Sequence, residues 1–389
     1  MMDPKKPDHN TAAASLRQLP TLIRAVLANR KAGKSPARDP HWVLVDSPER
    51  PARVPDDREA PILTAESGVC FVRTPEERFA DLPGYPFEPH YALVEGLRMH
   101  YVDEGLRDGQ AILMLHGQPS WSYLYRKMIP PLAQAGFRTV AVDHIGMGRS
   151  DKPVELSLHT FEKHVHRIKT FITTVGLEHI TLFGQDWGGL MGLRVVGDEP
   201  DLFARVVAAN TTLPIIPRGL NPFRVPNPVT LDCTLGDFIM PNDFSPATWA
   251  VNFQKWILYA LTAPNFTPSQ VVAANSVSKP SLEELAAYDA PYPSLIYKAA
   301  VRTFPSMVAA IERENVPAWK SLGKFQRPFL FFGGERDFNM GSRANQKRLT
   351  EHVPGASGQP HERFEAGHFI QEDIGEILAQ RMIRWMESS

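Results

Sequence analysis

Residues 180–194 read Ile-Thr-Leu-Phe-Gly-Gln-Asp-Trp-Gly-Gly-Leu-Met-Gly-Leu-Arg, and this stretch decides the fold. Its first four residues form an apolar run typical of a buried strand, and its last five look helical. Between the two, Gly184 and Gly188 flank Asp186 at the spacing of a sharp strand-to-helix turn that lifts its central side chain clear of the sheet. Only glycines fit beside so tight a turn. The stretch therefore predicts a nucleophile elbow in which aspartate takes the place of serine.

The predicted position of Asp186 suits a carboxylate. Unpaired N–H groups and the dipole of the following helix face such a side chain and favour an anion. An alternative interpretation is that Asp186 is simply the N-cap of that helix, because aspartate is common at N-caps. The motifs elsewhere in the chain have to distinguish the two.

Four further apolar runs look like buried strands, and helical patterns separate most of them. They are Ala111–Leu115, Thr139–Val142, Arg205–Ala209 and Pro328–Phe332. This alternation predicts the α/β class, with a mostly parallel sheet flanked by helices. Residues 213–310 are rich in proline and aromatic residues and too long for a loop, so we expect an inserted helical cap (lid) domain there.

The length of 389 residues, 43% of them hydrophobic, fits one catalytic domain with an insertion. We expect an N-terminal extension at 1–71, partly disordered, whose Thr21–Asn29 stretch is either a docking helix or part of a surface tail. The core then comprises residues 72–212 and 311–389 on either side of the cap.

Composition excludes several classes of protein. The formal net charge of −1 argues against a nucleic-acid binder or a protein held to a membrane surface by charge, and it suits a small neutral substrate. No run of about eighteen apolar residues is present, so no transmembrane helix is expected. The two cysteines, Cys70 and Cys233, do not make a disulfide framework, so we expect a protein of the reducing cytoplasm. We also expect a monomer.

A second motif, His116-Gly-Gln-Pro, directly follows the first strand. In folds with a nucleophile elbow, this loop gives one backbone N–H of the oxyanion hole, and the residue after the nucleophile gives the other. We assign these donors to Gln118 and Trp187. Asp143, after the second strand, is expected to cap or brace its glycine-bearing turn.

A catalytic triad needs an acid and then a histidine after the nucleophile. His368 follows an Ala-Gly turn ahead of the terminal helix. Asp337 lies in the loop after the fifth predicted strand in chain order, Pro328–Phe332. Glu335 is expected to face solvent or to pair with Arg336. The other position used for an acid, after the fourth strand, holds Asn210 and Thr211, so no carboxylate competes there.

An aspartate nucleophile narrows the chemistry. A carboxylate can displace a leaving group from saturated carbon to give an alkyl ester, here on Asp186. His368, oriented by Asp337, then activates a water that attacks the ester. A departing halide needs N–H donors, whereas an epoxide oxygen needs proton donors such as a pair of tyrosines.

From about Val72 to the C-terminus the chain resembles haloalkane dehalogenases of the α/β-hydrolase superfamily. The similarity is carried by three segments: 116–126, 184–189 and 366–372. It points to the subfamily with an aspartate acid after a late strand and two halide-binding tryptophans.

On this resemblance Trp187 is the first halide donor. Trp256 is the second, because its spacing to Ala290-Pro-Tyr-Pro fits the family better than that of Trp249. Trp256 also has a simpler interpretation, as an aromatic of the lid core. No metal-ligand cluster or phosphate loop is visible, so we expect no cofactor beyond a bound halide product such as chloride.

The resemblance also implies the pocket that would hold a small halogenated alkane. Its apolar walls are Phe253, Leu190, Phe304, Pro305 and Val308. Leu190 replaces a phenylalanine common in the nearest relatives, which bears on the size of the slot. Gln118 replaces an acidic residue, which bears on how the hydrolytic water is held.

Two other functions stay open. An epoxide hydrolase shares the same machinery, and its proton donors could come from Tyr259, Tyr288, Tyr292 and Tyr297. Gln185 argues against it, because that family usually has histidine before the nucleophile. A catalytically silent binding protein of this fold is the second alternative, and it predicts no halide release.

Overall fold

The computed structural model describes residues 60–216, 249–263, 266–311 and 314–388. These residues contain an eight-stranded sheet with the order β11-β10-β9-β8-β5-β6-β4-β3. Its strands are β3 (His90–Val94), β4 (Leu97–Gly105), β5 (Ala111–Leu115), β6 (Arg138–Val142), β8 (Ile180–Gln185), β9 (Phe203–Ala209), β10 (Phe329–Gly334) and β11 (Glu362–Phe364). The pairs β3–β4 and β4–β6 are antiparallel, and every other pair is parallel. The expected mostly parallel sheet is confirmed.

The five strands expected from apolar runs correspond to β5, β6, β8, β9 and β10. The side chains of β5 and β8 are buried on both faces, which explains their continuous apolar sequence. By contrast, β4 mixes buried, half-buried and exposed positions, and β11 has three residues, none of them fully buried. Such strands give no apolar run, so the sequence did not reveal them.

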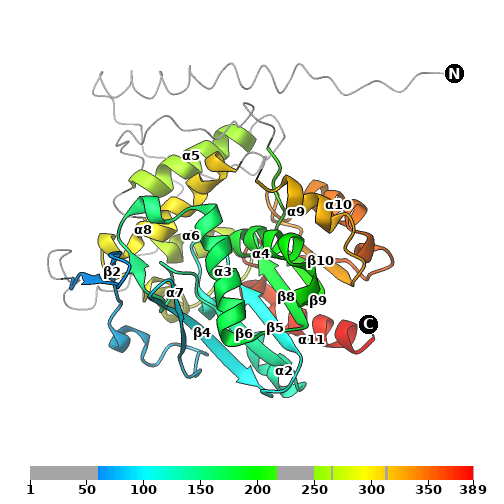
Figure 1. The fold of residues 1–389 in the computed structure, drawn as a ribbon, viewed down its shortest axis with the longest axis horizontal. Helices are drawn as coiled ribbons and strands as arrows, with labels where there is room; N and C mark the ends of the chain where they lie inside the picture. Colours follow the sequence, from blue (N-terminus) through cyan, green and yellow to red (C-terminus); the bar gives the residue numbers. More distant parts are fainter. Residues whose placement is uncertain (1–59, 217–248, 264–265, 312–313, 389) are drawn as a thin grey trace.

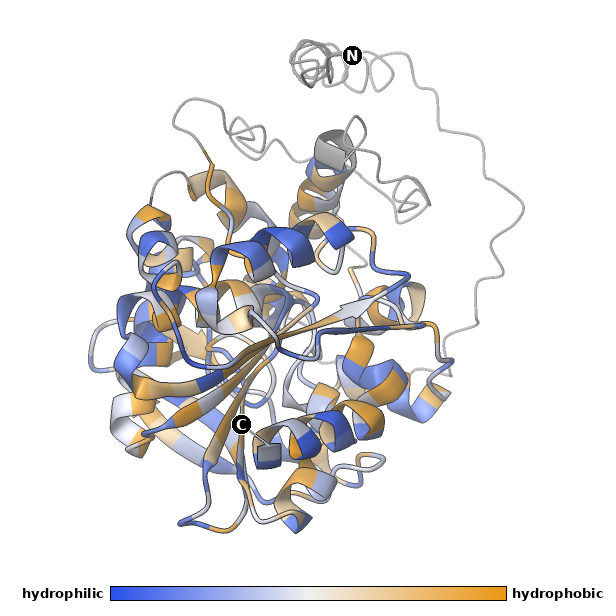
Figure 2. Cartoon of the chain, turned by 90° about the vertical axis from the view of Figure 1, so that its right-hand side faces the viewer, coloured by the Kyte–Doolittle hydropathy of each residue, from blue (hydrophilic) through white to orange (hydrophobic). Residues whose placement is uncertain are grey.

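Helices cover both faces of the sheet (Figure 1). One layer contains α3 (Phe161–Val175), α4 (Asp186–Asp198) and α9 (Val316–Leu322), and the other contains α2 (Ile129–Gln134) and α11 (Ile370–Ser388). A further helix, α10 (Arg343–His352), packs against β10. Figure 2 shows hydrophobic strands in the centre and helices of mixed colour around them, so the core lies between the layers.

A small sheet of β1 (Leu63–Thr64), β2 (Cys70–Val72) and β7 (Lys152–Pro153) joins the start of the described chain to the core. β2 spans residue 71, where we expected the N-terminal extension to end. The expected helix or tail at Thr21–Asn29 lies outside the described residues.

Between β9 and α9 the described residues form helices, which we call the inserted helices. They are α5 (Trp249–Thr262), α6 (Pro268–Asn275), α7 (Leu282–Asp289), η7 (Leu295–Lys298), α8 (Ala299–Thr303) and η8 (Phe304–Ala310). Other 3-10 turns are η2 (Glu76–Phe79), η3 (Ser122–Tyr125), η4 (Leu156–Leu158), η5 (Pro200–Leu202) and η9 (Pro354–Ala356). No helix among the described residues has the length and apolarity needed to cross a membrane.

The inserted helices contact loops at the carboxyl ends of the strands. The Trp121 indole donates to the carbonyl of Ala287 at 3.1 Å, and the Gln118 side-chain amide donates to the carbonyl of Val301 at 2.7 Å. These loops follow β5, next to the strand that leads into the elbow. The inserted helices therefore cover the edge of the sheet where Asp186 lies.

Candidate active site

Asp186 is the first residue of α4 and has a φ of 50°, which is rare for a residue with a side chain. Added Cβ atoms explain its glycine neighbours: one on Gly184 would lie 2.7 Å from the Gly189 Cα, and one on Gly188 would lie 2.1 Å from the Leu115 carbonyl oxygen. The backbone is thus bent tightly against the end of β5. The alternative interpretation of Asp186 as an N-cap is wrong, because Gln185 occupies that position.

The carboxylate of Asp186 meets the loop after β5. The backbone N–H of Gln118 donates to Asp186 Oδ1 at 2.9 Å. A Cβ on Gly117 would lie 2.3 Å from the same oxygen, so glycine is required for this approach. The N–H of Trp187 belongs to the first turn of α4, where N–H groups have no partner within the helix. One oxygen of the carboxylate is therefore already in the expected oxyanion site.

His368 lies between two carboxylates. Its Nδ1 is 2.8 Å from Asp337 Oδ2, and its Nε2 is 3.5 Å from Asp186 Oδ2. Burial lowers the pKa of His368, but the carboxylates of Asp337 and Asp186 outweigh burial and raise it to about 10. The three residues expected to form a triad are thus brought together, and the imidazole is positively charged at neutral pH.

Two amide side chains that the sequence did not reveal hold the backbone of His368. Asn210 Nδ2 donates to the carbonyls of Gly367 and His368 at 2.9 and 3.0 Å, while its Oδ1 accepts from the N–H of Gly334 at 2.8 Å. Gln185 Nε2 donates to the His368 carbonyl at 3.1 Å and lies 3.2 Å from the ring Nε2. Both amides lie at the carboxyl ends of neighbouring strands, which is the one signal that could have indicated them.

Trp187 lies beside the elbow and is buried. Its ring packs edge-on against Phe304 with centroids 5.9 Å apart. No described residue accepts a hydrogen bond from its indole N–H. This is the N–H group that the resemblance assigns to a halide.

The surroundings of Trp256 bear on both interpretations of that residue. Its ring stacks on Tyr259 at 5.9 Å and meets Phe266 at 6.1 Å, as expected for a core aromatic of the inserted helices. Its helix α5 also packs against η8, which carries Phe304 beside Trp187. The side chain of Trp249 lies outside the described residues.

The residues expected to line the pocket are all buried. They are Phe253, Leu190, Phe304, Pro305 and Val308. Leu190 lies on α4 one turn after Asp186, so the two side chains share a face of the helix. The side chain of Gln118 is anchored to the inserted helices through the carbonyl of Val301.

Two other expectations about carboxylates can be compared with the structure. Asp143 accepts from the backbone N–H groups of Ser122 and Arg149 at 2.6 and 2.8 Å, so it braces its turn as predicted. Of the two alternatives expected for Glu335, pairing with Arg336 is wrong, while partial exposure to solvent is observed, with 32% of the side chain exposed. Glu335 pairs with Arg343 at 2.7 Å and with Arg363 at 3.1 Å.

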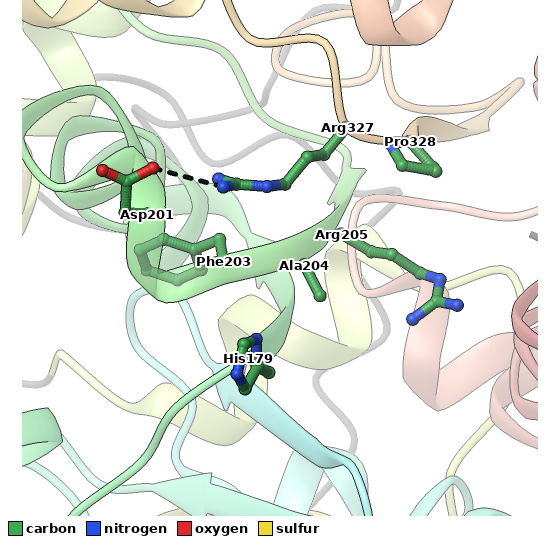
Figure 3. Close-up of a pocket in the computed structure, with 7 residues that line it drawn as sticks. All are labelled: His179, Asp201, Phe203, Ala204, Arg205, Arg327 and Pro328. Atoms are coloured by element: carbon green, nitrogen blue, oxygen red, sulfur yellow. Dashed lines mark hydrogen bonds and ion pairs between the residues drawn. The ribbon is translucent and has the colours of Figure 1, made fainter.

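A cavity of about 260 Å³ lies at the opposite edge of the sheet, by the amino ends of β9 and β10 (Figure 3). There Arg327 pairs with Asp201 at 3.2 Å, and His179, the residue before β8, also lines the cavity. None of the expected site residues lines this cavity. No cluster of three metal-ligating side chains is present in the described part of the chain.

Comparison with known proteins shows the family of the chain. Residues 110–373 match the family model described as alpha/beta hydrolase fold. A haloalkane dehalogenase of Mycobacterium marinum is 43% identical over 81% of this chain and 99% of its own length. The chain belongs to the haloalkane dehalogenases. Another haloalkane dehalogenase, from Psychrobacter cryohalolentis, is 39% identical over 82% of this chain and 98% of its own length.

A solved structure supports the same assignment. The tetrameric haloalkane dehalogenase of Paraglaciecola agarilytica superposes with a TM-score of 0.66 at 31% identity, covering 80% of this chain and 97% of that one. The fold class of this haloalkane dehalogenase, expected from five strands and one turn, is thereby confirmed.

Proposed function

We propose that this haloalkane dehalogenase hydrolyses the carbon–halogen bond of a small neutral haloalkane, giving an alcohol and a halide through an alkyl ester on Asp186. The observation that carries the proposal is that the two oxygens of that carboxylate have different neighbours. Oδ1 accepts from the N–H of Gln118 at 2.9 Å, while Oδ2 faces the ring of His368 at 3.5 Å.

In the first step Oδ2 of Asp186 attacks the carbon that carries the halogen. The new carbon–oxygen bond forms as the carbon–halogen bond breaks, and the halide leaves with the electron pair. Oδ1 becomes the carbonyl oxygen of the ester and keeps its hydrogen bond to Gln118. The oxyanion site is therefore filled by the right oxygen before the second step begins.

The departing halide is stabilised by indole N–H groups. Trp187 offers a donor that no described residue uses, and Trp256 on α5 is the proposed second donor. Each such bond to an anion contributes roughly 1.5 to 3 kcal/mol. An epoxide hydrolase would need tyrosine hydroxyls instead, and that of Tyr288 already donates to Glu372 at 2.5 Å.

The second step needs His368 as a neutral base. Ester formation removes the negative charge of Asp186, and with it one of the two carboxylates that raise the pKa of His368. The imidazole then loses its proton to solvent and takes one from a water, which attacks the ester carbonyl. The charge that develops on Oδ1 is stabilised by the N–H groups of Gln118 and Trp187. Collapse releases the alcohol and restores the carboxylate.

The organisation of the chain follows from this chemistry. Residues 213–310 act as the cap that closes the apolar pocket, and residues 72–212 and 311–389 supply the reacting groups. Haloalkane dehalogenases need water as co-substrate and no cofactor, and the halide is a bound product. A monomer in the cytoplasm stays a prediction for this chain.

A pH-indicator assay tests the proposal. The full-length enzyme is mixed with short and long primary bromoalkanes and, separately, with styrene oxide, and bromide is measured alongside acid. We expect equal amounts of acid and bromide from at least one bromoalkane. Turnover of styrene oxide without any release of bromide from the bromoalkanes would contradict the proposal. Absence of acid and bromide with every bromoalkane of the series would also contradict it.

A further inference from the structure

The carboxylate of Asp373, in the first turn of α11, joins three segments of the chain. Its Oδ2 accepts from the backbone N–H of Gly367 at 2.7 Å and from that of Val277 at 3.1 Å. Its Oδ1 accepts from the backbone N–H and the hydroxyl of Ser278 at 2.7 and 2.6 Å. One side chain thus binds the residue before His368 and the stretch that follows inserted helix α6.

The same stretch of the inserted helices also holds His368 directly. The carbonyl of Asn275, the last residue of α6, accepts from the backbone N–H of His368 at 2.8 Å. A Cβ on Gly367 would lie 2.2 Å from that carbonyl oxygen. The two backbones are therefore in direct contact, and the loop of the catalytic histidine and residues 275–278 form one unit.

The residue before Asp373 has a parallel role toward another inserted helix. Glu372 is fully buried and accepts from the hydroxyl of Tyr288 on α7 at 2.5 Å. Arg126 and Lys127 neutralise it at 2.6 and 2.8 Å. Two consecutive acids in the first turn of α11 thus hold two parts of the inserted helices, but only Asp373 also binds the loop of His368.

We propose that Asp373 is a positioning residue for the second half of the reaction, locking residues 275–278 onto the loop of His368 so that the imidazole keeps its place once Asp186 is an ester. The inference rests on the proposed function. In the free enzyme the imidazole is held by the carboxylates of Asp337 and Asp186. The ester removes the second of these, and the position of the ring then depends on Asp337 and on its own backbone.

This reasoning predicts a selective effect. Alkylation uses the carboxylate of Asp186, its donor Gln118 and the halide donors, none of which contacts Asp373. Ester hydrolysis uses His368, whose backbone Asp373 holds through Gly367 and Asn275. Weakening the lock should slow hydrolysis and leave alkylation unchanged.

The test is the variant Asp373→Asn. An amide keeps the size of the side chain, but its NH₂ group faces backbone N–H groups, so at least one of them loses its acceptor. The control is Glu376→Gln, which makes the same charge change at an exposed position of the same helix. A milder variant, Ser278→Ala, removes one of the four hydrogen bonds to Asp373 and keeps the carboxylate.

Rapid-quench kinetics with a bromoalkane that the wild type turns over separate the two steps. For Asp373→Asn we expect ester hydrolysis to fall about tenfold or more, with alkylation within about twofold and the alkyl-enzyme accumulating in the mass spectrum. Ser278→Ala should show a smaller effect of the same kind. Glu376→Gln should match the wild type.

A second readout does not depend on turnover. The proton between His368 Nδ1 and Asp337 gives a far-downfield NMR resonance, identified by its loss in His368→Gln, and we expect it to broaden in Asp373→Asn but not in Glu376→Gln. Equal slowing of both steps, or wild-type hydrolysis with an unchanged resonance, would overturn the proposal. If Asp373→Asn does not fold, the same rates and the same resonance are measured in Ser278→Ala and decide whether the proposal holds. Failure of the proposed function is distinguishable, because the wild type would then release no bromide.

Discussion

Two histidines in this molecule each bind an aspartate at nearly the same distance. His368 Nδ1 lies 2.8 Å from Asp337 Oδ2, and His100 Nδ1 lies 2.7 Å from Asp143 Oδ2. Their electrostatics are nevertheless opposite. The pKa of His368 is raised to about 10 in spite of burial, whereas burial lowers the pKa of His100.

The surroundings of each pair explain the difference. Asp143 also accepts from two backbone N–H groups, and both His100 and Asp143 are completely buried. The side chain of His368 is 16% exposed and faces a second carboxylate, Asp186. A histidine–aspartate pair alone therefore does not make a catalytic base. In the proposed mechanism, the neighbouring carboxylate of Asp186 and access to water are also needed.

The largest expected effect comes from breaking each pair in turn. Asp337→Asn should lower turnover by on the order of 10³ to 10⁴-fold, because His368 loses the acceptor that fixes its tautomer. Asp143→Asn should instead lower the free energy of unfolding by roughly 3 kcal/mol, since two backbone N–H groups lose a charged acceptor. Steady-state halide release and denaturant unfolding measure the two effects. If both variants lose activity to a similar extent at equal folded fraction, the two pairs do not differ in function and the comparison is contradicted.

The pH dependence of stability should also differ between the pairs. The pKa of folded His368, about 10, lies above the unfolded value of about 6.5, so its contribution is complete below pH 6.5 and is lost as pH rises toward 10. The pKa values of folded His100 and Asp143 are lowered, so their contributions are present at neutral pH and are lost in acid. Denaturant unfolding at pH 5, 7 and 10 measures the loss of stability in acid and the loss in alkali.

His368→Gln provides the control for this pH experiment. It should remove the loss of stability between pH 7 and 10 and keep the loss in acid. If the loss of unfolding free energy between pH 7 and 10 is unchanged in His368→Gln, the imidazole is not held as a cation.

The smallest effect concerns the inserted helices. Trp256→Phe should weaken bromide binding by about 10 to 100-fold, because one indole hydrogen bond to the anion is lost. Quenching of tryptophan fluorescence by bromide measures it, with Trp249→Phe as the matched control. A loss confined to Trp249→Phe would move the second halide donor to that residue.

The sequence predicted best what depends on local geometry. Gly184 and Gly188 are required by a single tight turn, so the elbow and the strand before it could be recognised from a few residues. The order of the chain then placed Asp337 and His368. In contrast, Asn210 and Asp373 bind groups 157 and 95 residues away, Gly367 and Ser278 respectively, and no local pattern marks such contacts.

The expected pairing of Glu335 with Arg336 failed for a related reason. It assumed that neighbours in sequence are neighbours in space. Arg336 pairs instead with Glu365, and Glu335 is taken by Arg343 and Arg363. Long arginine side chains choose among partners that only the folded chain brings together.

The most direct test of the central claim is the mass of His368→Gln after mixing with a primary bromoalkane that the wild type hydrolyses. Alkylation does not need the base, so the account predicts one bromide released per enzyme and a mass gain equal to one alkyl group, mapped by peptide sequencing to Asp186. Release of bromide without any gain in protein mass, or an alkyl group on another residue, would contradict it.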